Sequence, residues 1–153
     1  MILLPRSTVV FAVATLMSAT ATIAYADEPV ELITVAEAQL PPATSDGIDR
    51  NITRGPGIDA VAPSPIGVEG TFRFAVKFKP RNGVAIDPAQ VRVTYMREPN
   101  IDLTARLKDF ISADGIEAPN VLAPAGEHLI LIEAVDLEGR TGRGEMTVTV
   151  TGQ

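Results

Sequence analysis

Four segments of the chain alternate apolar and polar residues, with the period of two that is typical of a strand that buries one face. Two of them are TFRFAVKF, residues 71–78, and VRVTYM, residues 91–96. The other two are HLILIEAVD, residues 128–136, and EMTVTV, residues 145–150. Three of the five phenylalanines of the chain fall on one face of residues 71–78, so this face is predicted to be core. A shorter segment, IDAVAP, fits an edge strand that prolines end.

The last two segments are predicted to form a hairpin. They are joined by DLEGRTGRG, whose glycines suit the positive φ angles of a turn and whose charged groups suit contact with water. One face of the first strand carries His128, Ile130, Ile132 and Ala134, and the other carries Leu129, Leu131, Glu133 and Val135. The inward residues of the second strand are Met146, Val148 and Val150. A second turn is predicted at Asn82-Gly83, before the start signal Asp87-Pro88.

The period changes in residues 101–111, IDLTARLKDFI, where the apolar residues have helical spacing. These apolar residues are Leu103, Leu107, Phe110 and Ile111. Asp102 or Thr104 is placed to cap a short helix, and this interpretation is favoured over a cation site built on the same two side chains. Prolines and glycines predict an irregular loop for residues 112–126, SADGIEAPNVLAPAG.

The N-terminal part of the chain predicts export and a leader. Residues 1–26 contain Arg6, the apolar run VVFAVATLM and the small-residue site AYA before Asp27, the pattern of a cleaved secretory signal. The apolar run is shorter than the roughly 20 residues of a membrane span. Residues 27–56 are predicted to be a mobile or loosely attached leader, because residues 41–70 contain five prolines and five glycines, although VELITVAEA could form a short strand or helical turn.

Composition excludes several classes of function for the exported chain. Cleavage near Ala26 would leave 127 residues, one domain, with 12 basic and 19 acidic residues and a net charge of about −7. This acidic balance argues against a nucleic-acid partner. The chain has no cysteine, which excludes disulfides, thiol catalysis and thiolate-bound zinc, and fits a periplasmic or secreted bacterial protein.

Residues 125–152, AGEHLILIEAVDLEGRTGRGEMTVTVTG, resemble the closing strands of bacterial immunoglobulin-like and fibronectin-III-like domains. There a glycine opens the penultimate strand, an aromatic residue follows two positions later, and the strand ends in Asp-x-x-Gly-Asn/Arg. The matching residues here are Gly126, His128, Asp136, Gly139 and Arg140. The resemblance implies an all-β, immunoglobulin-like antiparallel β-sandwich over about residues 57–151 of a domain at 57–153, with one short helix between the middle strands. His128 replaces the usual tyrosine, which plugs the core and bonds nearby backbone.

Two surfaces are predicted to carry binding. In immunoglobulin topology, the loops at residues 81–87 and 136–144 meet at one end of the sandwich. The candidate residues of this end are Arg81, Asn82, Asp87, Asp136, Glu138, Arg140 and Arg143. A calcium site at Asp87, Asp136 and Glu138 is the alternative, but calcium takes about six to eight oxygen ligands, so pairing of the carboxylates with the arginines is favoured.

The second predicted surface is the apolar strip Leu129, Leu131 and Val135, on the face that a strand normally turns to water. The helix of residues 102–111 is the favoured cover, and a second copy or another envelope protein is the alternative. His128, the only histidine, is interpreted as a core plug rather than a catalytic base.

The sequence therefore predicts a non-catalytic interaction or accessory module of the bacterial envelope, with no cofactor, no bound metal and no membrane span. Its partner is expected to be another envelope protein or a second copy of the chain. The alternatives are a carbohydrate-binding accessory domain, against which the absence of tryptophan speaks, and a small hydrolase that uses His128.

Overall fold

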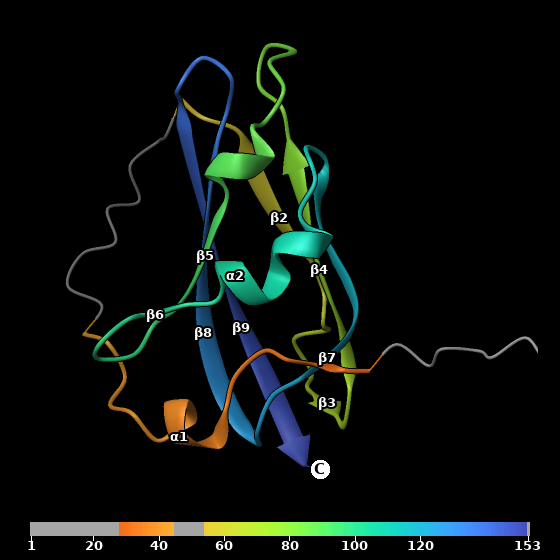
Figure 1. The fold of residues 1–153 in the computed structure, drawn as a ribbon, viewed down its shortest axis with the longest axis vertical. Helices are drawn as coiled ribbons and strands as arrows, with labels where there is room; N and C mark the ends of the chain where they lie inside the picture. Colours follow the sequence, from red (N-terminus) through yellow and green to blue (C-terminus); the bar gives the residue numbers. More distant parts are fainter. Residues whose placement is uncertain (1–27, 45–53, 153) are drawn as a thin grey trace, which may run out of the picture.

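The computed structural model describes residues 28–44 and 54–152 (Figure 1). The predicted signal segment, residues 1–26, lies outside the described residues, as does the part of the predicted leader at residues 45–53. The described part is mostly β structure, which confirms the prediction of an all-β protein.

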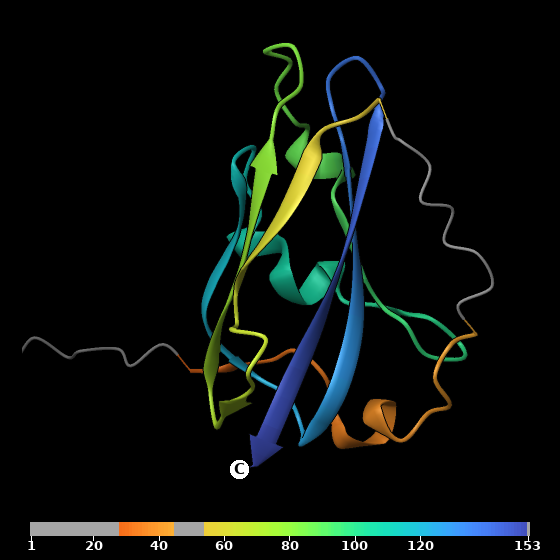
Figure 2. The ribbon, with the colours of Figure 1, turned by 180° about the vertical axis from the view of Figure 1, so that it is seen from behind.

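Two mixed sheets lie on either side of a common core (Figures 1 and 2). The first has the strand order β1 (Val30–Glu31), β7 (Gly115–Leu122), β4 (Phe72–Lys79), β2 (Gly57–Ala62). The second has the order β3 (Val68–Glu69), β9 (Thr141–Gly152), β8 (Gly126–Val135), β5 (Arg92–Tyr95), β6 (Ile101–Asp102). The helical turns are α1 (Val35–Ala38), α2 (Thr104–Leu107), and the 3-10 turns η1 (Pro88–Gln90) and η2 (Lys108–Phe110). The β1–β7 and β3–β9 pairs are parallel, which corrects the prediction of an antiparallel fold.

The core is built from the faces that the alternating segments predict. On β4, Phe72, Phe74 and Phe78 are buried, which confirms the prediction from the phenylalanine pattern. The hairpin of β8 and β9 is paired in register from Gly126 with Val150 to Val135 with Thr141. Its inward residues are buried against the first sheet; they are His128, Ile130, Ile132, Ala134, Met146, Val148 and Val150. Burial of this apolar surface is the main source of stability in a chain without disulfides.

The turn of the β8–β9 hairpin is shorter than the glycine-rich stretch predicts. It covers residues 136–140, and Gly142 and Gly144 lie inside β9. A Cβ atom at Gly142 would overlap the carbonyl oxygen of Pro56, and one at Gly144 would lie 2.8 Å from Cγ2 of Ile58. These two glycines therefore let the chain around β2, in the other sheet, approach β9 closely, rather than supplying positive φ angles for the turn.

The predicted irregular loop at residues 112–126 contains β7, so that prediction is wrong. Strand β7 lies between β1 and β4, and it pairs with β4 at Phe72–Val121 and Phe74–Ala118. The register shifts between these two pairs, and Pro119 falls at the shift. Since β1 pairs with β7 only at Val121 and Leu122, the missing amide hydrogen of Pro119 interrupts neither ladder.

Of the helix predicted at residues 102–111, α2 and η2 form residues 104–110, and they close the open side between the two sheets. In Figures 1 and 2 α2 lies between the sheets rather than outside them. Leu103 and Leu107 are fully buried in the common core. The carboxylate of Asp102 accepts the amide of Thr104, the first residue of α2, at 2.8 Å, but the N-cap residue is Leu103, which makes no side-chain cap. The prediction that this helix covers the strip of Leu129, Leu131 and Val135 is wrong, because its leucines are needed in the core.

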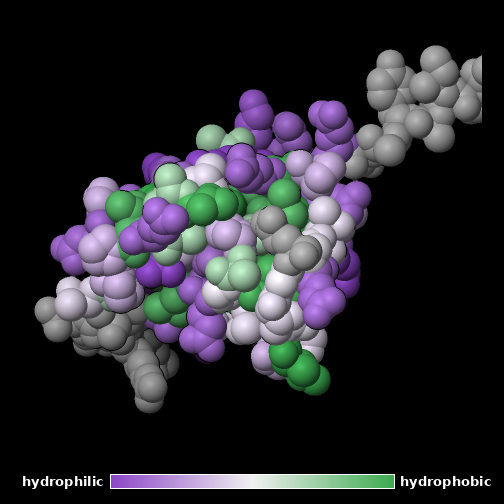
Figure 3. All heavy atoms as spheres, turned by 90° about the horizontal axis from the view of Figure 1, so that it is seen from below, coloured by the Kyte–Doolittle hydropathy of each residue, from purple (hydrophilic) through white to green (hydrophobic). Residues whose placement is uncertain are grey.

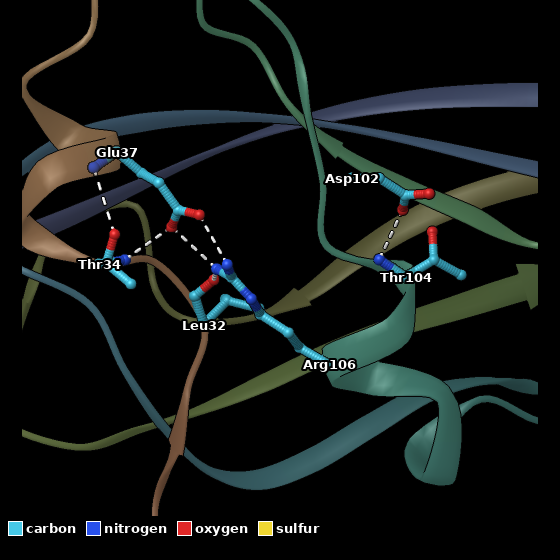
Figure 4. A network of polar contacts seen from close by, with 6 residues as sticks. All are labelled: Leu32, Thr34, Glu37, Asp102, Thr104 and Arg106. Carbon is cyan, nitrogen blue, oxygen red and sulfur yellow. Dashed lines mark hydrogen bonds and ion pairs between the residues drawn. The ribbon is translucent and has the colours of Figure 1, made fainter.

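Residues 28–44 form an N-terminal strap that packs along the core, so the prediction of a loosely attached leader is wrong for this part. The segment VELITVAEA supplies both elements that it could form, strand β1 and helix α1. Leu32 and Ile33, between them, are fully buried. Figure 4 shows Arg106 of α2 reaching the Leu32 carbonyl and the Glu37 carboxylate, while Thr34 and Glu37 cap α1 reciprocally.

Candidate functional site

The two predicted binding loops contact each other at one end of the fold. The amide of Asp87 donates to the carbonyl of Val135 at 2.9 Å, and the amide of Leu137 donates to the carbonyl of Ala85 at 3.0 Å. Positive φ angles at Asn82 and Gly83 form the tight turn that the Asn-Gly signal predicts. This loop end therefore has a backbone held by hydrogen bonds from both sides.

A buried carboxylate organises the β8–β9 turn. The Asp136 side chain is fully buried, and its Oδ1 accepts the amides of Glu138 at 3.0 Å and Arg140 at 2.9 Å. Its Oδ2 accepts Nε of Arg140 at 2.8 Å. Burial acts to raise the pKa of Asp136, but the two amides and the Arg140 guanidinium outweigh it, and the pKa is lowered. The carboxylate stays ionised and fixes the turn.

The other predicted residues of the loop end have structural partners as well. Arg140 also lies 3.1 Å from the Glu138 carboxylate and donates to the Arg81 carbonyl at 3.4 Å. Arg143 pairs with Glu133 across the hairpin. Asp87 caps η1, accepting the Ala89 amide at 3.0 Å and the Gln90 side-chain amide at 3.0 Å. Pairing with arginine is confirmed for Asp136 and Glu138, but the prediction is wrong for Asp87, whose carboxylate caps η1 instead.

The carboxylates of the loop end are arranged for internal hydrogen bonds rather than for a cation. Asp87 and Asp136 direct their oxygens to different partners, the first to η1 and the second to its own turn. Within residues 28–44 and 54–152, no group of three or more histidine, aspartate or glutamate side chains is placed to hold a metal ion.

Leu137 is the feature of the loop end that the sequence analysis missed. Its side chain is 70% exposed, although the backbone on both sides is fixed by the Asp136 carboxylate and by the Ala85 carbonyl. A large apolar residue in the middle of a polar turn was the available signal. Leu137 is thus a large apolar side chain that is exposed on a turn whose backbone is held by hydrogen bonds.

The predicted apolar strip is only partly accessible. Leu129, Leu131 and Val135 are half-buried and lie beside polar residues of the neighbouring strands, with Leu129 opposite Thr147 and Leu131 opposite Glu145. A partner on this strip stays a prediction. Among the described residues, the large apolar side chains with the greatest exposure lie outside this strip; they are Ile66, Leu137, Val35 and Val61.

His128 is held in the core by both ring nitrogens. Its Nε2 lies 2.8 Å from the Pro124 carbonyl, which can only accept, so this nitrogen carries the hydrogen. Nδ1 then accepts the hydroxyl hydrogen of Tyr95 at 2.9 Å, and Arg97 Nε donates to the same hydroxyl at 2.7 Å. Burial, followed by the charge of Arg97, lowers the pKa of His128 despite the Pro124 bond. His128 is buried as a core plug, as predicted, and its contact with the Pro124 carbonyl also ties it to nearby backbone.

A hollow on the outer face of the first sheet is a further feature that the alternating pattern did not reveal. It has a volume of about 250 Å³, with Ala75 and Gly115 in its lining. Arg73 and Glu117, which pair with each other, line it as well. It lies on a different part of the fold from the loop end.

Across the part of the chain that the structure describes, no helix is long and apolar enough to cross a membrane. Comparisons with known protein families, with curated proteins and with solved structures found no match. The arrangement of the chain's own residues is therefore the basis for assigning a function.

Proposed function

We propose that this chain is an exported, non-catalytic interaction module that binds a partner protein of the bacterial envelope through the loop end. The single observation that carries the proposal is the 70% exposure of Leu137 on a turn that the buried Asp136 carboxylate holds rigid. A rigid loop loses little conformational freedom on binding, so an exposed apolar anchor there can contribute most of its burial energy to affinity. The pattern of residues 1–26 supports export.

An immunoglobulin-like β-sandwich is the proposed scaffold. In the first sheet, β2, β4 and β7 follow the order of strands A, B and E of that fold. In the facing sheet, β9, β8 and β5 follow the order of strands G, F and C. Strand β1 of the strap then occupies the edge where strand D would lie, because the chain between β6 and β7 forms α2 and η2 instead. Loops at the ends of such sandwiches commonly carry the binding residues, which supports a partner at residues 81–87 and 136–140.

The test is affinity capture with two matched variants. Leu137→Asp removes the proposed anchor, and Ile66→Asp makes the same change at another exposed residue, which is 89% exposed. The two positions lie near opposite ends of β9. Leu137 precedes the first residue of β9, whereas Ile66 precedes β3, which pairs with the last residues of β9. Figure 3 views the fold from below Figure 1, and on this end of the fold apolar residues are interspersed with hydrophilic ones.

Residues 27–153 and both variants are immobilised and exposed to an envelope extract, after circular dichroism and thermal melting show that each is folded. We expect one or more proteins to be retained by the parent and by Ile66→Asp but lost with Leu137→Asp. Equal retention by all three, or equal loss with both variants, would contradict the assignment of the loop end.

A further inference from the structure

A hollow with cationic side chains adjoins the loop end. It has a volume of about 330 Å³ and is lined by the backbone turn of residues 55–57 together with Lys79, Pro80, Arg81 and Arg143. Among the described residues that line it, three are cationic and none is acidic. In a chain with a formal net charge of −6, such a local concentration of positive charge is a candidate site for an anion.

Two of the three cations that line this hollow already pair with carboxylates. Lys79 pairs with Asp59, and Arg143 pairs with Glu133, both at hydrogen-bonding distance. The side chains of Lys79 and Arg143 are still 63% and 54% exposed. An incoming carboxylate can therefore reach them from solvent. Because two neighbouring carboxylates already offset part of the charge, the hollow suits single carboxylate groups spaced along a chain better than one doubly charged phosphate group.

The hollow and the turn that carries Leu137 are connected through Arg81. Arg81 lines the hollow, and its carbonyl accepts a hydrogen bond from Arg140, the residue that closes the turn carrying Leu137. The same turn bonds the Ala85 carbonyl of the neighbouring loop. A partner that covers Leu137 and extends over the loop of residues 81–87 would reach the hollow at Arg81.

We infer that the hollow takes a carboxylate-bearing segment, rich in aspartate or glutamate, of the same protein that buries Leu137. This inference rests on the proposed function and names the chemistry of its partner. An apolar anchor next to cationic groups fits a protein surface with an apolar depression bordered by acidic residues. A protein segment is favoured over an acidic glycan because the hollow is lined by glycine, proline and charged residues, with no aromatic side chain among the described residues for a sugar ring to stack on.

The inference is tested with an acidic peptide as the probe. Hexaglutamate, acetylated and amidated at its ends, is titrated into ¹⁵N-labelled protein of residues 27–153, with inorganic phosphate and tetragalacturonate as parallel probes. We expect hexaglutamate to shift the amide resonances of Gly55, Gly57 and Arg81, and the affinity to fall as salt is added. Tighter binding of phosphate or of tetragalacturonate would overturn the choice of an acidic protein segment.

Two double variants distinguish binding at the hollow from a general effect of the protein's charge. Lys79→Gln with Arg143→Gln removes two of its cations, and we expect hexaglutamate affinity to fall about tenfold, as for the loss of charged contacts. Arg73→Gln with Lys77→Gln removes the same charge from exposed positions of β4 outside the hollow, and is expected to leave the affinity within about twofold. Equal losses in both, or the absence of saturable shifts, would overturn the site.

The two proposals fail separately. If Leu137→Asp abolishes capture of a partner while hexaglutamate does not bind, the interaction module stands and the cationic hollow is not its acidic subsite. If hexaglutamate binds the hollow while capture is insensitive to Leu137→Asp, the anion site stands without the anchor, and the inference that both serve the same partner is overturned.

Discussion

Arg106 and Glu37 form a two-point ion pair between elements that lie 69 residues apart in the chain. Nη2 of Arg106 donates to Oε1 of Glu37 at 2.6 Å, and Nη1 donates to Oε2 at 2.8 Å (Figure 4). Nη1 also donates to the Leu32 carbonyl at 2.7 Å. One guanidinium thus holds both the helix and the buried backbone of the N-terminal strap against α2.

The ion pair between Arg106 and Glu37 is expected to make the stability of the fold sensitive to acid. The hydrogen bonds from Arg106, with those from Thr34, outweigh burial and lower the pKa of Glu37 to about 2 from 4.5. Since the folded pKa is the lower one, the stabilisation is present above pH 4.5 and is lost as pH falls towards 2. Because the two side chains are partly exposed, the contribution of the ion pair to the free energy of unfolding is reduced to about 1 to 3 kcal/mol.

Urea unfolding between pH 2 and 7 measures this effect. We expect the free energy of unfolding of the parent to exceed that of Glu37→Gln at pH 7 and the difference to shrink below pH 4. Glu28→Gln, which neutralises an exposed carboxylate of the same strap, should follow the parent at every pH. A difference that does not change with pH would contradict the role of the ion pair.

His128 predicts a second pH dependence, at a higher pH. Its pKa is lowered in the folded protein, so the unfolded chain binds a proton first as pH falls below about 6.5. Stability should therefore fall by up to about 1.4 kcal/mol per pH unit, from pH 6.5 down to the folded pKa. Because the chain has one histidine, the slope between pH 5 and 7 can be assigned to it.

The slope should disappear in His128→Gln, measured by chemical unfolding from pH 5 to 7. Should that variant not fold, an NMR titration of the His128 ring in the parent gives the answer directly. A folded-state pKa at or above 6.5 would show that the ring is not held neutral by its contacts with Tyr95 and Pro124.

Two alanine substitutions in β9 should have very different costs. Gly142→Ala places a Cβ against the Pro56 carbonyl, and backbone must move to accept it, so we expect a loss of about 1 to 3 kcal/mol or more. Gly152→Ala is the matched control, because a Cβ there meets nothing within 4 Å. Its effect should stay within about 0.5 kcal/mol. Thermal unfolding of both variants compares them, and similar melting temperatures would contradict the close approach of the sheets.

The Asp136 carboxylate is expected to control the order of the β8–β9 turn. Asp136→Ala removes the acceptor of the Glu138 and Arg140 amides, so their hydrogen exchange should accelerate by about tenfold or more. Asp136→Asn keeps an acceptor oxygen and should cause a smaller change. Glu138→Ala, which alters a side chain that is 60% exposed, should leave the Arg140 amide protected. Unchanged exchange in Asp136→Ala would mean that the turn is rigid for another reason.

The sequence predicts the strands whose burial alternates along the chain, and it fails where a contact joins distant segments. Strands β4, β8 and β9 follow the period of two because one face of each meets the core. The strap does not, because Leu32 and Ile33 are buried as adjacent residues, and β1 pairs in parallel with β7 far along the chain. Local patterns carry no information about such a pairing.

The meeting of the two loops at one end of the fold was predicted, but the arrangement of the side chains there was not. The meeting of the two loops follows from the order of strands, so Arg81 and Asp136 could be placed at one end in advance. The burial of Asp136 and the exposure of Leu137 depend on the direction in which the turn closes, which is fixed by hydrogen bonds to Arg140 and to the Ala85 carbonyl. The contact with Ala85 is tertiary, and no spacing rule predicts it, whereas the contacts between Asp136 and Arg140 are local to the turn and follow the Asp-x-x-Gly-Arg spacing.

The borders of the two sheets have a consequence for association of the chain with itself. Among the described strands at sheet edges, β1, β3 and β6 are two residues long, and the longer β2 lies close to β9, where Gly144 admits Ile58. Pro119 lies on the part of β7 that β1 leaves uncovered, where it offers no amide hydrogen. An unpaired strand from another molecule therefore finds little backbone to extend, so the folded chain is protected against edge-to-edge aggregation and the growth of fibrils.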